Sequence, residues 1–343
     1  MGWVSGASLT AATSAAGGFG ILAAVTMTTE LLEGALASVQ ERTSAPFGVN
    51  FRPDQPDLDA RVALCVDAGV RLVSFAGAPT NAAIDRLHEA GILVMPTVGA
   101  RRHAEKMLAA GVDAVIAQGG EGGGHTGTVP TSLLLPQVVD AVGSELPVLG
   151  AGGFHDGRGL VAALAWGADG IAMGTRFMLT QESTVPEPIK QLYLSTAVTG
   201  TVVTVALDGM PQRVVRTDLV DRLERSSGVS RLARSFTAAL RFRRLTGTPL
   251  RQMVREGLAM RRSQGLSWSQ MAMAANAPML IKAALVDGRP EVGVLPTGQV
   301  AGVIEAEHTA VAGEAETCLP TVAELIDRIV GEAEETLARL EKR

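Results

Sequence analysis

Short apolar runs alternate with longer alanine-rich stretches over the first half of the chain. Each run is four to seven residues long, and glycine or a polar residue follows it. Continuous apolar runs of this length are typical of strands buried on both faces, and their alternation with helical stretches predicts a parallel sheet. The predicted strands are 19–23, 47–51, 72–76, 93–97, 112–118, 147–151 and 170–173.

Helices are predicted between these strands, and glycine ends several of them. The helical stretches are 7–16, 58–68, 81–90, 100–110, 134–142 and 157–166. Gly69, Gly91, Gly111 and Gly167 each stand where a left-handed helix cap would lead into the next strand. An open doubly wound sheet would accommodate seven strands, but the regular alternation of strands and glycine-capped helices, without a reversal point, favours a TIM (β/α)8 barrel that lacks its first strand. We therefore expect the N-terminus to be truncated.

The pattern changes after residue 180 and predicts three domains. Residues 1–205 form the barrel, and 206–292 form a helical, arginine-rich lid over its mouth. Residues 293–343 return to the barrel and end in an amphipathic helix over 321–342. Between residues 218 and 262 there are eleven arginines and four acids. They are interpreted either as a solvated helical face or as a phosphate-binding surface.

Composition excludes several classes of protein. The apolar content of 47% excludes wholesale disorder, and no apolar run approaches the roughly 20 residues that span a bilayer. The first residues lack the pattern of a signal peptide. Cys65 and Cys318 have neither a metal-site spacing nor a disulfide framework, which suits the cytoplasm. The net charge of −5 disfavours a nucleic-acid surface. We expect no metal.

The most distinctive stretch is the glycine-rich segment 118–127, which follows the predicted strand 112–118. Its glycines would let the backbone approach a ligand closely, although a flexible linker has the same composition. Among its few long polar side chains, His125 is the candidate acid–base residue, because imidazole exchanges protons near neutral pH. Glu121 is the second candidate, and its carboxylate would also serve to accept backbone N–H bonds within its own turn.

Two further glycine turns follow the last two strands of the barrel, where such folds commonly bind phosphate. They contain Gly152, Gly153, Gly174 and Thr175. Other predicted strand ends carry uncharged polar groups that suit the edge of a heteroaromatic ring, namely Asn50, Thr97 and Gln118. The strand ends carry no lysine for a Schiff base. A phosphorylated flat cofactor such as FMN is therefore expected.

At these residues the sequence resembles the nitronate monooxygenase-like flavoproteins, which include flavin-dependent enoyl reductases. The similar strings are 16–20, 48–51, 118–127, 151–153, 173–177 and 298–302. The resemblance implies a TIM barrel with non-covalently bound FMN and His125 beside the flavin. It adds Gly123, Gly124 and Gln299 to the cofactor site, together with Met1 and Gly2, the remnant of a Gln-x-x-Met-like turn.

Within this family, several strings are most similar to a branch that degrades steroid rings. They are MGWVSGA, QGGEGGGHTG, LLLP, FHDGRGL, LDGMP and LSWSQMAMAANAPML. The likeness implies an FMN-dependent dehydrogenase of a CoA thioester of a bicyclic steroid remnant, with a nicotinamide acceptor. The arginines of the lid would then hold coenzyme A phosphates. Its methionines would either fill a core or line a ring pocket.

Three alternative functions remain open at this stage. The chain could be a nitronate monooxygenase that uses oxygen, a flavin-dependent enoyl-thioester reductase, or a flavin-binding barrel without turnover. The expected partner is a small-molecule substrate rather than nucleic acid or membrane, and a homodimer is the assembly considered.

Overall fold

The computed structural model describes residues 1–53, 55, 57–225, 268–305, 307–311 and 314–342. Its centre is a seven-stranded parallel sheet whose strands follow one another in chain order. The strands are β1 (Ile21–Ala23), β2 (Gly48–Phe51), β3 (Leu72–Phe75), β4 (Leu93–Val98), β5 (Val115–Gln118), β7 (Val148–Ala151) and β8 (Gly170–Ala172). A barrel requires a strand order without reversal, as is found here, whereas the order of a doubly wound sheet reverses at a switch point. The prediction of seven parallel strands is therefore confirmed.

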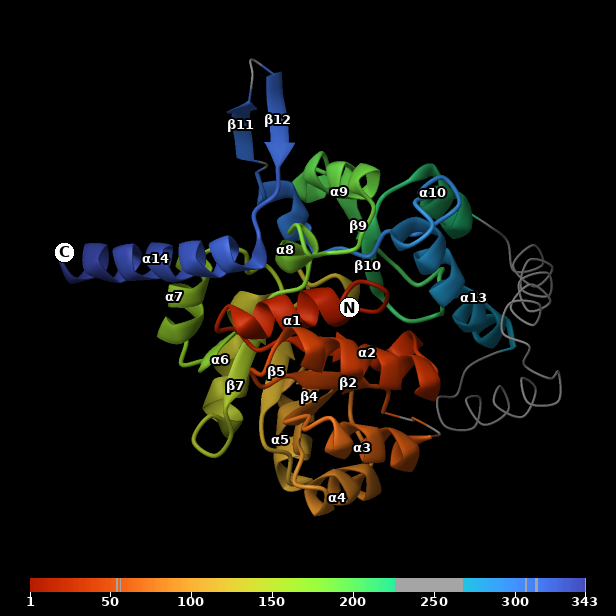
Figure 1. Cartoon of the computed structure of the whole chain (residues 1–343), viewed down its shortest axis with the longest axis vertical. Coiled ribbons are helices and arrows are strands. Elements are labelled where there is room, and N and C mark those ends of the chain that lie inside the picture. Colours follow the sequence, from red (N-terminus) through yellow and green to blue (C-terminus); the bar gives the residue numbers. More distant parts are fainter. Residues whose placement is uncertain (54, 56, 226–267, 306, 312–313, 343) are drawn as a thin grey trace.

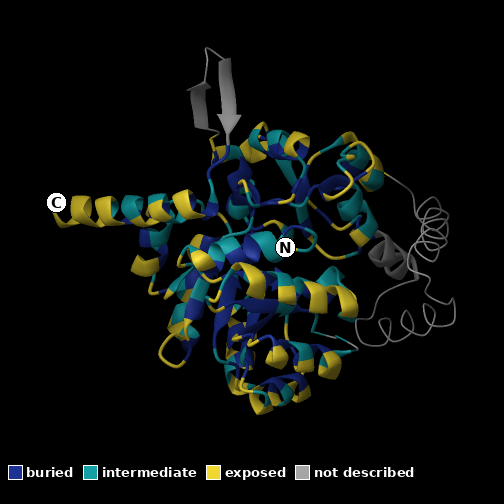
Figure 2. Cartoon of the chain, viewed as in Figure 1, coloured by how far each residue is buried: buried dark blue, intermediate teal, exposed yellow. Residues whose placement is uncertain are grey.

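Helices connect these strands and cover the outside of the sheet (Figure 1). They are α1 (Ala7–Ala15), α2 (Thr29–Arg42), α3 (Leu58–Asp67), α4 (Asn81–Glu89), α5 (Arg101–Ala109), α6 (Thr131–Val142) and α7 (Gly157–Ala165). All four glycines predicted as helix caps have a positive φ, between 63° and 84°. The sheet is buried beneath the helices, whose outward faces are exposed (Figure 2). Val49, Val94 and Val148 are fully buried in the core, as expected for strands covered on both faces.

Aspartates at the start of two strands tie neighbouring strands together. Asp113 accepts a hydrogen bond from the Val94 N–H at 2.7 Å, and Asp169 accepts one from the Val148 N–H at 2.8 Å. Each carboxylate thus satisfies a backbone donor at the start of the preceding strand.

A small antiparallel sheet lies beside the barrel, and the sequence pattern revealed only one of its strands. It contains β9 (Thr201–Thr204), β10 (Gln212–Val215) and the two-residue β6 (Gly124–His125) in the order β6-β10-β9. Residues 201–205 are all β-branched, which favours a strand, whereas the partner strands have no strong period of their own. This sheet connects the glycine-rich segment to a part of the chain 87 residues further on.

The second half of the chain is mainly helical where it is described. It contains α8 (Thr175–Met178), α9 (Glu187–Leu194), α10 (Asp218–Arg225), α13 (Trp268–Leu285) and α14 (Val322–Glu341), and a hairpin of β11 (Glu307–Val311) and β12 (Glu314–Cys318). The hairpin and the C-terminal half of α14 project from the body (Figure 1). Most of the predicted arginine-rich segment lies outside the described residues. Among the described helices, none has both the length and the apolar character to cross a membrane.

Candidate active site

The loops after three barrel strands leave the sheet at one edge. Gln118 at the end of β5 pairs with Ala151 of β7, and Ala151 pairs with Ala172 of β8. Because parallel strands share one direction, the segments that follow must meet above this edge. The glycine-rich segment 118–127 and the two predicted phosphate turns are therefore neighbours.

The glycines at 119 and 123 are required by contacts within the protein. A Cβ on Gly119 would lie 2.5 Å from Thr131 N and Cα, and one on Gly123 would lie 2.5 Å from Gly298 N. Both distances are far inside van der Waals contact with backbone atoms. Glycine was expected here to let a ligand approach closely, but at these two positions it is the chain itself that approaches.

Glu121 caps helix α6. Its two carboxylate oxygens accept hydrogen bonds from Thr131 N–H at 2.9 and 3.2 Å, and from Thr131 Oγ1–H at 2.7 Å. The expected backbone-accepting role is therefore present, but the donor lies ten residues away at the N-terminus of α6 rather than in the same turn. A carboxylate at this end also interacts favourably with the helix dipole.

The turn after β7 differs from Gly119 and Gly123, because its glycines have a positive φ. The φ angles are 97° at Gly152 and 84° at Gly153. A Cβ on Gly153 would meet only the Glu121 side chain, at 3.7 Å. The neighbouring turn after β8 brings Gly174 beside Met1, whose Sδ lies 3.1 Å from the position of an added Cβ. Met1 is thus placed with the predicted phosphate turns.

Thr175 joins the turn after β8 to the returning segment 297–299. The Gly298 N–H donates to Thr175 Oγ1 at 3.0 Å, and the Gln299 N–H donates to the Glu121 carbonyl at 3.0 Å. The structure therefore brings together six predicted cofactor residues around the ends of β7 and β8: Gly123, Gly152, Gly153, Gly174, Thr175 and Gln299.

The other predicted cofactor residues lie on β2, β4 and β5 or beside the turn after β1. Asn50 on β2 donates from Nδ2 to Ser74 Oγ at 2.9 Å, and Thr97 lies on β4. Gln118 donates from Nε2 to the His125 carbonyl at 2.8 Å. Gly2 contacts the turn after β1, since a Cβ there would lie 3.3 Å from Thr26 Cγ2. Ser74, which the sequence did not single out, is a fully buried hydroxyl in this group.

His125 belongs to β6, where it pairs with Gln212 of β10. Gly124, with φ of 69°, turns the chain just before it. The imidazole Nε2 lies 2.8 Å from Asp208 Oδ2 and 3.2 Å from Gln212 Nε2. The Gln212 amide also donates to Asp208 Oδ2. The ring is more than half exposed, whereas both partners are buried.

The Asp208 carboxyl is held in its ionised form. Burial alone would raise its pKa, but hydrogen bonds from His125, Met210 N–H and Gln212, with the charge of His125, outweigh it and lower the pKa below its ordinary value. The site therefore contains an ionised acceptor beside an exposed imidazole, which is an arrangement suited to proton transfer.

Arg213 anchors the glycine-rich segment to the small sheet. Its Nε and Nη2 donate to the Gly120 carbonyl at 3.1 and 2.9 Å, and its Nη1 donates to Thr201 Oγ1 at 3.0 Å. Burial lowers the pKa of this guanidinium, and the charge of Glu121 opposes the shift.

The sequence missed Asp208, Gln212 and Arg213 as site residues. The string LDGMP, which contains Asp208, was noticed only as part of a resemblance. No local spacing connects it with His125, which lies 83 residues earlier. The β-branched residues 201–205 are a local signal that could have suggested a hairpin leading into β10.

Comparison with known proteins defines the class to which this barrel belongs. The model of a protein family described as nitronate monooxygenase matches residues 1–61 and 57–314. The chain belongs to the nitronate monooxygenase family and is an oxidoreductase. The resemblance inferred from the motifs is thereby confirmed.

Two relatives share one name. The chain is 54% identical over 338 residues to the (3aS,4S,5R,7aS)-5-hydroxy-7a-methyl-1-oxo-octahydro-1H-indene-4-carboxyl-CoA dehydrogenase of Mycobacterium tuberculosis, covering 97% of this chain and 91% of the relative. It is 50% identical over 333 residues to the protein of the same name in Rhodococcus jostii, covering 97% and 90%.

Solved structures confirm the barrel-like fold. FabK from Thermotoga maritima matches with a TM-score of 0.75 and 32% identity over 100% of this chain and 93% of that one. Nitroalkane oxidase from Streptomyces ansochromogenes matches with a TM-score of 0.73 and 28% identity over 99% and 95%. The predicted α/β barrel class is therefore correct.

Proposed function

We propose that the protein is an FMN-dependent dehydrogenase of a CoA thioester that carries a bicyclic, steroid-derived indene ring, with a nicotinamide as the final acceptor. The observation that carries this proposal is the identity of 54% and 50%, over 97% of the chain, to two relatives named as dehydrogenases of such a thioester. The position of His125 at the barrel mouth supports it.

The residues at the ends of β7 and β8 fit the phosphate of a flavin mononucleotide. Gly153 has the left-handed backbone of a tight turn and open space where a side chain would lie. We assign the phosphate to the backbone of Gly152, Gly153, Gly174 and Thr175, since such turns bind anions through N–H groups. Asn50, Thr97 and Gln118 would hold the ring through uncharged polar groups. Met1, Gly2, Gly123, Gly124 and Gln299 complete the proposed site.

His125 is the proposed catalytic residue. A flavin, when bound, supplies an acceptor for two electrons and a hydrogen. The thioester acidifies the hydrogen on the carbon beside its carbonyl, so a nearby base can remove it as a proton. The exposed imidazole of His125 would receive that proton, and the carbon next along the ring would release its hydrogen with the electron pair. The product is then an α,β-unsaturated thioester.

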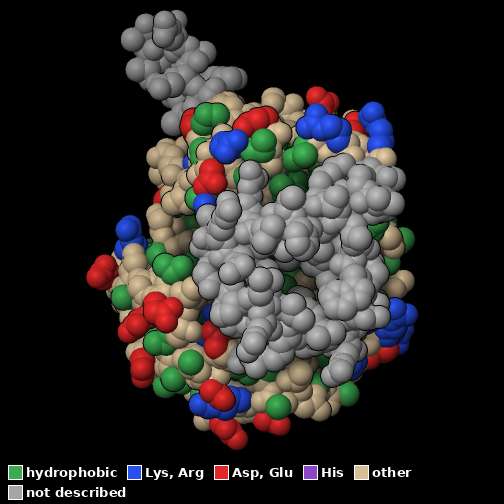
Figure 3. All heavy atoms as spheres, turned by 90° about the vertical axis from the view of Figure 1, so that its right-hand side faces the viewer, with side chains coloured by type: hydrophobic (Ala, Val, Ile, Leu, Met, Phe, Trp, Pro, Cys, Tyr) green, Lys and Arg blue, Asp and Glu red, His purple; other side chains and the backbone are tan. Residues whose placement is uncertain are grey.

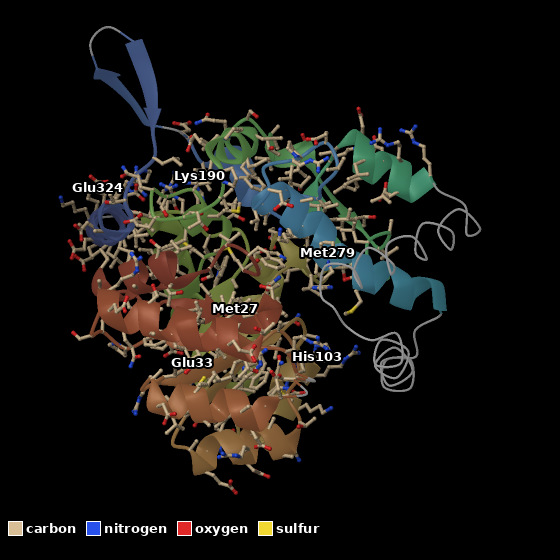
Figure 4. The ribbon with its side chains drawn as sticks, turned by 45° about the vertical axis from the view of Figure 1, so that its right-hand side comes forward. Met27, Glu33, His103, Lys190, Met279 and Glu324 are labelled. Atoms are coloured by element: carbon tan, nitrogen blue, oxygen red, sulfur yellow. The ribbon has the colours of Figure 1, made fainter. Side chains whose placement is uncertain are left out.

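The described helices α10 and α13 are proposed to form part of a lid over the substrate. Residues on the His125 side of the small sheet pack against them, since Val214 of β10, Val220 of α10 and Ala277 of α13 share one buried cluster. Figure 4 shows Met279 on α13, in a layer separate from the barrel residues Met27 and His103. The arginines proposed to bind coenzyme A lie mostly outside the described residues. On the face in Figure 3, acidic and basic side chains of the described residues are interspersed around the edge.

The first test is the absorbance spectrum of the purified protein, followed by anaerobic addition of the indene-carboxyl-CoA thioester. Flavin bands that bleach with the thioester and recover with NAD⁺ or NADP⁺ support the proposal. Rapid oxygen uptake with propyl-2-nitronate, and no bleaching by the thioester, would instead support a nitronate monooxygenase. A protein without flavin bands would contradict both.

Substitution of His125 tests the catalytic assignment. His125→Gln keeps a polar side chain but cannot exchange the proton, so kcat with the thioester is expected to fall by about 10²–10⁴-fold. The flavin spectrum should be retained. A variant as active as the parent would remove His125 from the mechanism and favour a different base.

A further inference from the structure

We propose that Asp208, supported by Gln212, is a positioning residue that fixes the tautomer of His125, so that Nε2 carries the proton and Nδ1 exchanges protons with the substrate. The inference rests on the proposed function, because His125 is the proton acceptor there. It assigns the reacting atom and the group that selects it.

The contacts at Nε2 leave one consistent arrangement of hydrogens. An ionised carboxylate only accepts hydrogen bonds, and Asp208 Oδ2 lies 2.8 Å from His125 Nε2. A lone pair on Nε2 would face the lone pairs of Oδ2 at that distance, so the hydrogen lies on Nε2. The Gln212 Nε2 group, 3.2 Å from the ring nitrogen, then donates to Asp208 Oδ2 rather than to the imidazole. A neutral imidazole has one N–H, and Nδ1 is then the basic nitrogen.

Gln212 and the turn at 208–210 hold the carboxylate in place. The Gln212 amide donates to Oδ2, and the Met210 N–H donates to Oδ1 at 3.0 Å. Asp208 is 8% exposed and Gln212 is 2% exposed, so solvent does not replace these donors. Both carboxylate oxygens are thus occupied, and the carboxylate has a single orientation toward the ring.

The backbone of His125 is held as firmly as its Nε2. The Gln118 amide donates to its carbonyl at 2.8 Å, and β10 pairs with it through Gln212. The side chain is 57% exposed, and within the described part of the chain no hydrogen-bond partner is recorded for Nδ1. The ring is therefore fixed on the Asp208 side and open on the Nδ1 side.

A second aspartate–histidine pair provides a matched control. His88 Nε2 on α4 lies 2.9 Å from Asp113 Oδ2, which is nearly the same geometry. This pair lies at the opposite end of the sheet from the predicted site, because Asp113 binds the N-terminal residues of β4. The same substitution at Asp113 therefore changes a histidine contact without touching the proposed site.

The experiment is ¹⁵N NMR of the full chain with labelled histidine, recorded at a pH at which neutral imidazole predominates. Comparison with His125→Gln assigns the His125 signals among the five histidines. The parent should show a protonated Nε2 and a pyridine-type Nδ1. In Asp208→Ala no carboxylate accepts from Nε2, and the Gln212 amide N–H is left facing the ring, so the proton should shift toward Nδ1. An unchanged Nε2–H tautomer in this variant would overturn the proposal.

Steady-state kinetics provides the second readout. Asp208→Ala should lower kcat about 10²–10³-fold, as expected when the proton is no longer held on Nε2, with KM changed less than about threefold. Asp113→Ala should leave both constants and the His125 signals unchanged. A loss confined to KM, or equal losses in the two variants, would overturn the positioning role. If the parent does not oxidise the thioester, the proposed function fails, while the NMR spectra still decide the tautomer.

Discussion

The segment 118–127 after β5 and the turn at 152–153 after β7 are both rich in glycine, but they need glycine for different reasons. In the first, Gly119 and Gly123 have no room for a side chain, because backbone atoms of Thr131 and Gly298 occupy the space. In the second, Gly153 has room but a φ of 84°. One set is fixed by packing and the other by backbone conformation.

This difference separates the part of the site that the protein fills from the part that it leaves open. The segment 118–127 is packed against α6 and the returning segment 297–299, and this packing positions His125. In the turn after β7, Gly153 is exposed, which suits the binding of an anion to its backbone. Composition alone cannot distinguish a glycine required by packing from one required by backbone conformation, since the residue is the same in both cases.

The largest effect should come from filling a crowded position. Gly123→Ala places a Cβ 2.5 Å from Gly298 N, where backbone must move, so we expect a loss of about 3 kcal/mol or more in the free energy of unfolding. Urea titration measures it. Gly127→Ala in the same segment is the control, because its Cβ would lie 3.7 Å from the Gly99 carbonyl, an ordinary contact. Equal losses in the two variants would contradict the packing explanation.

A smaller effect is expected at the open turn. Gly153→Ala forces an L-residue to a φ of 84°, which costs about 1–2 kcal/mol, and no steric clash adds to it. Urea titration should give this loss, and flavin affinity should fall because the turn is proposed to bind phosphate. Gly34→Ala on α2 has open space and a helical backbone, so it should instead stabilise by up to about 1 kcal/mol. A neutral Gly153→Ala would show that the turn relaxes freely.

The smallest effect concerns the carboxylate cap beyond this turn. Asp156 caps α7 by accepting from the Gly159 N–H at 2.8 Å. Burial alone would raise its pKa, but that bond, with Arg158 and His155, lowers the pKa below its ordinary value of 3.8. The ionised carboxylate therefore contributes its full stabilisation of the fold at pH values above this ordinary pKa. This stabilisation is lost as the pH falls through the lowered pKa.

Asp156→Asn keeps a capping side chain and removes only the charge. At neutral pH the parent should be more stable than this variant by about 0.3–1 kcal/mol. Urea titrations from pH 7 downward should show the difference shrinking below about pH 4. A difference that stays constant to lower pH would mean that the charge of Asp156 does not stabilise the cap.

The sequence by itself determined the parallel strand order and most helix positions, and it singled out His125 as the candidate acid–base residue. These follow from local signals, because apolar runs, glycine caps and a lone imidazole in a glycine-rich segment can each be recognised within about ten residues. The resemblance of the motifs also identified the family correctly.

Only the tertiary structure decided what surrounds His125 and why the segment 118–127 is rich in glycine. The Asp208 contact joins residues 83 apart, and the approach of Gly123 to Gly298 spans about half of the chain. β10 has too few residues for a clear period, so its pairing with β6 could not be predicted. Such contacts depend on where the barrel brings distant loops together, and no local sequence pattern predicts which loops meet.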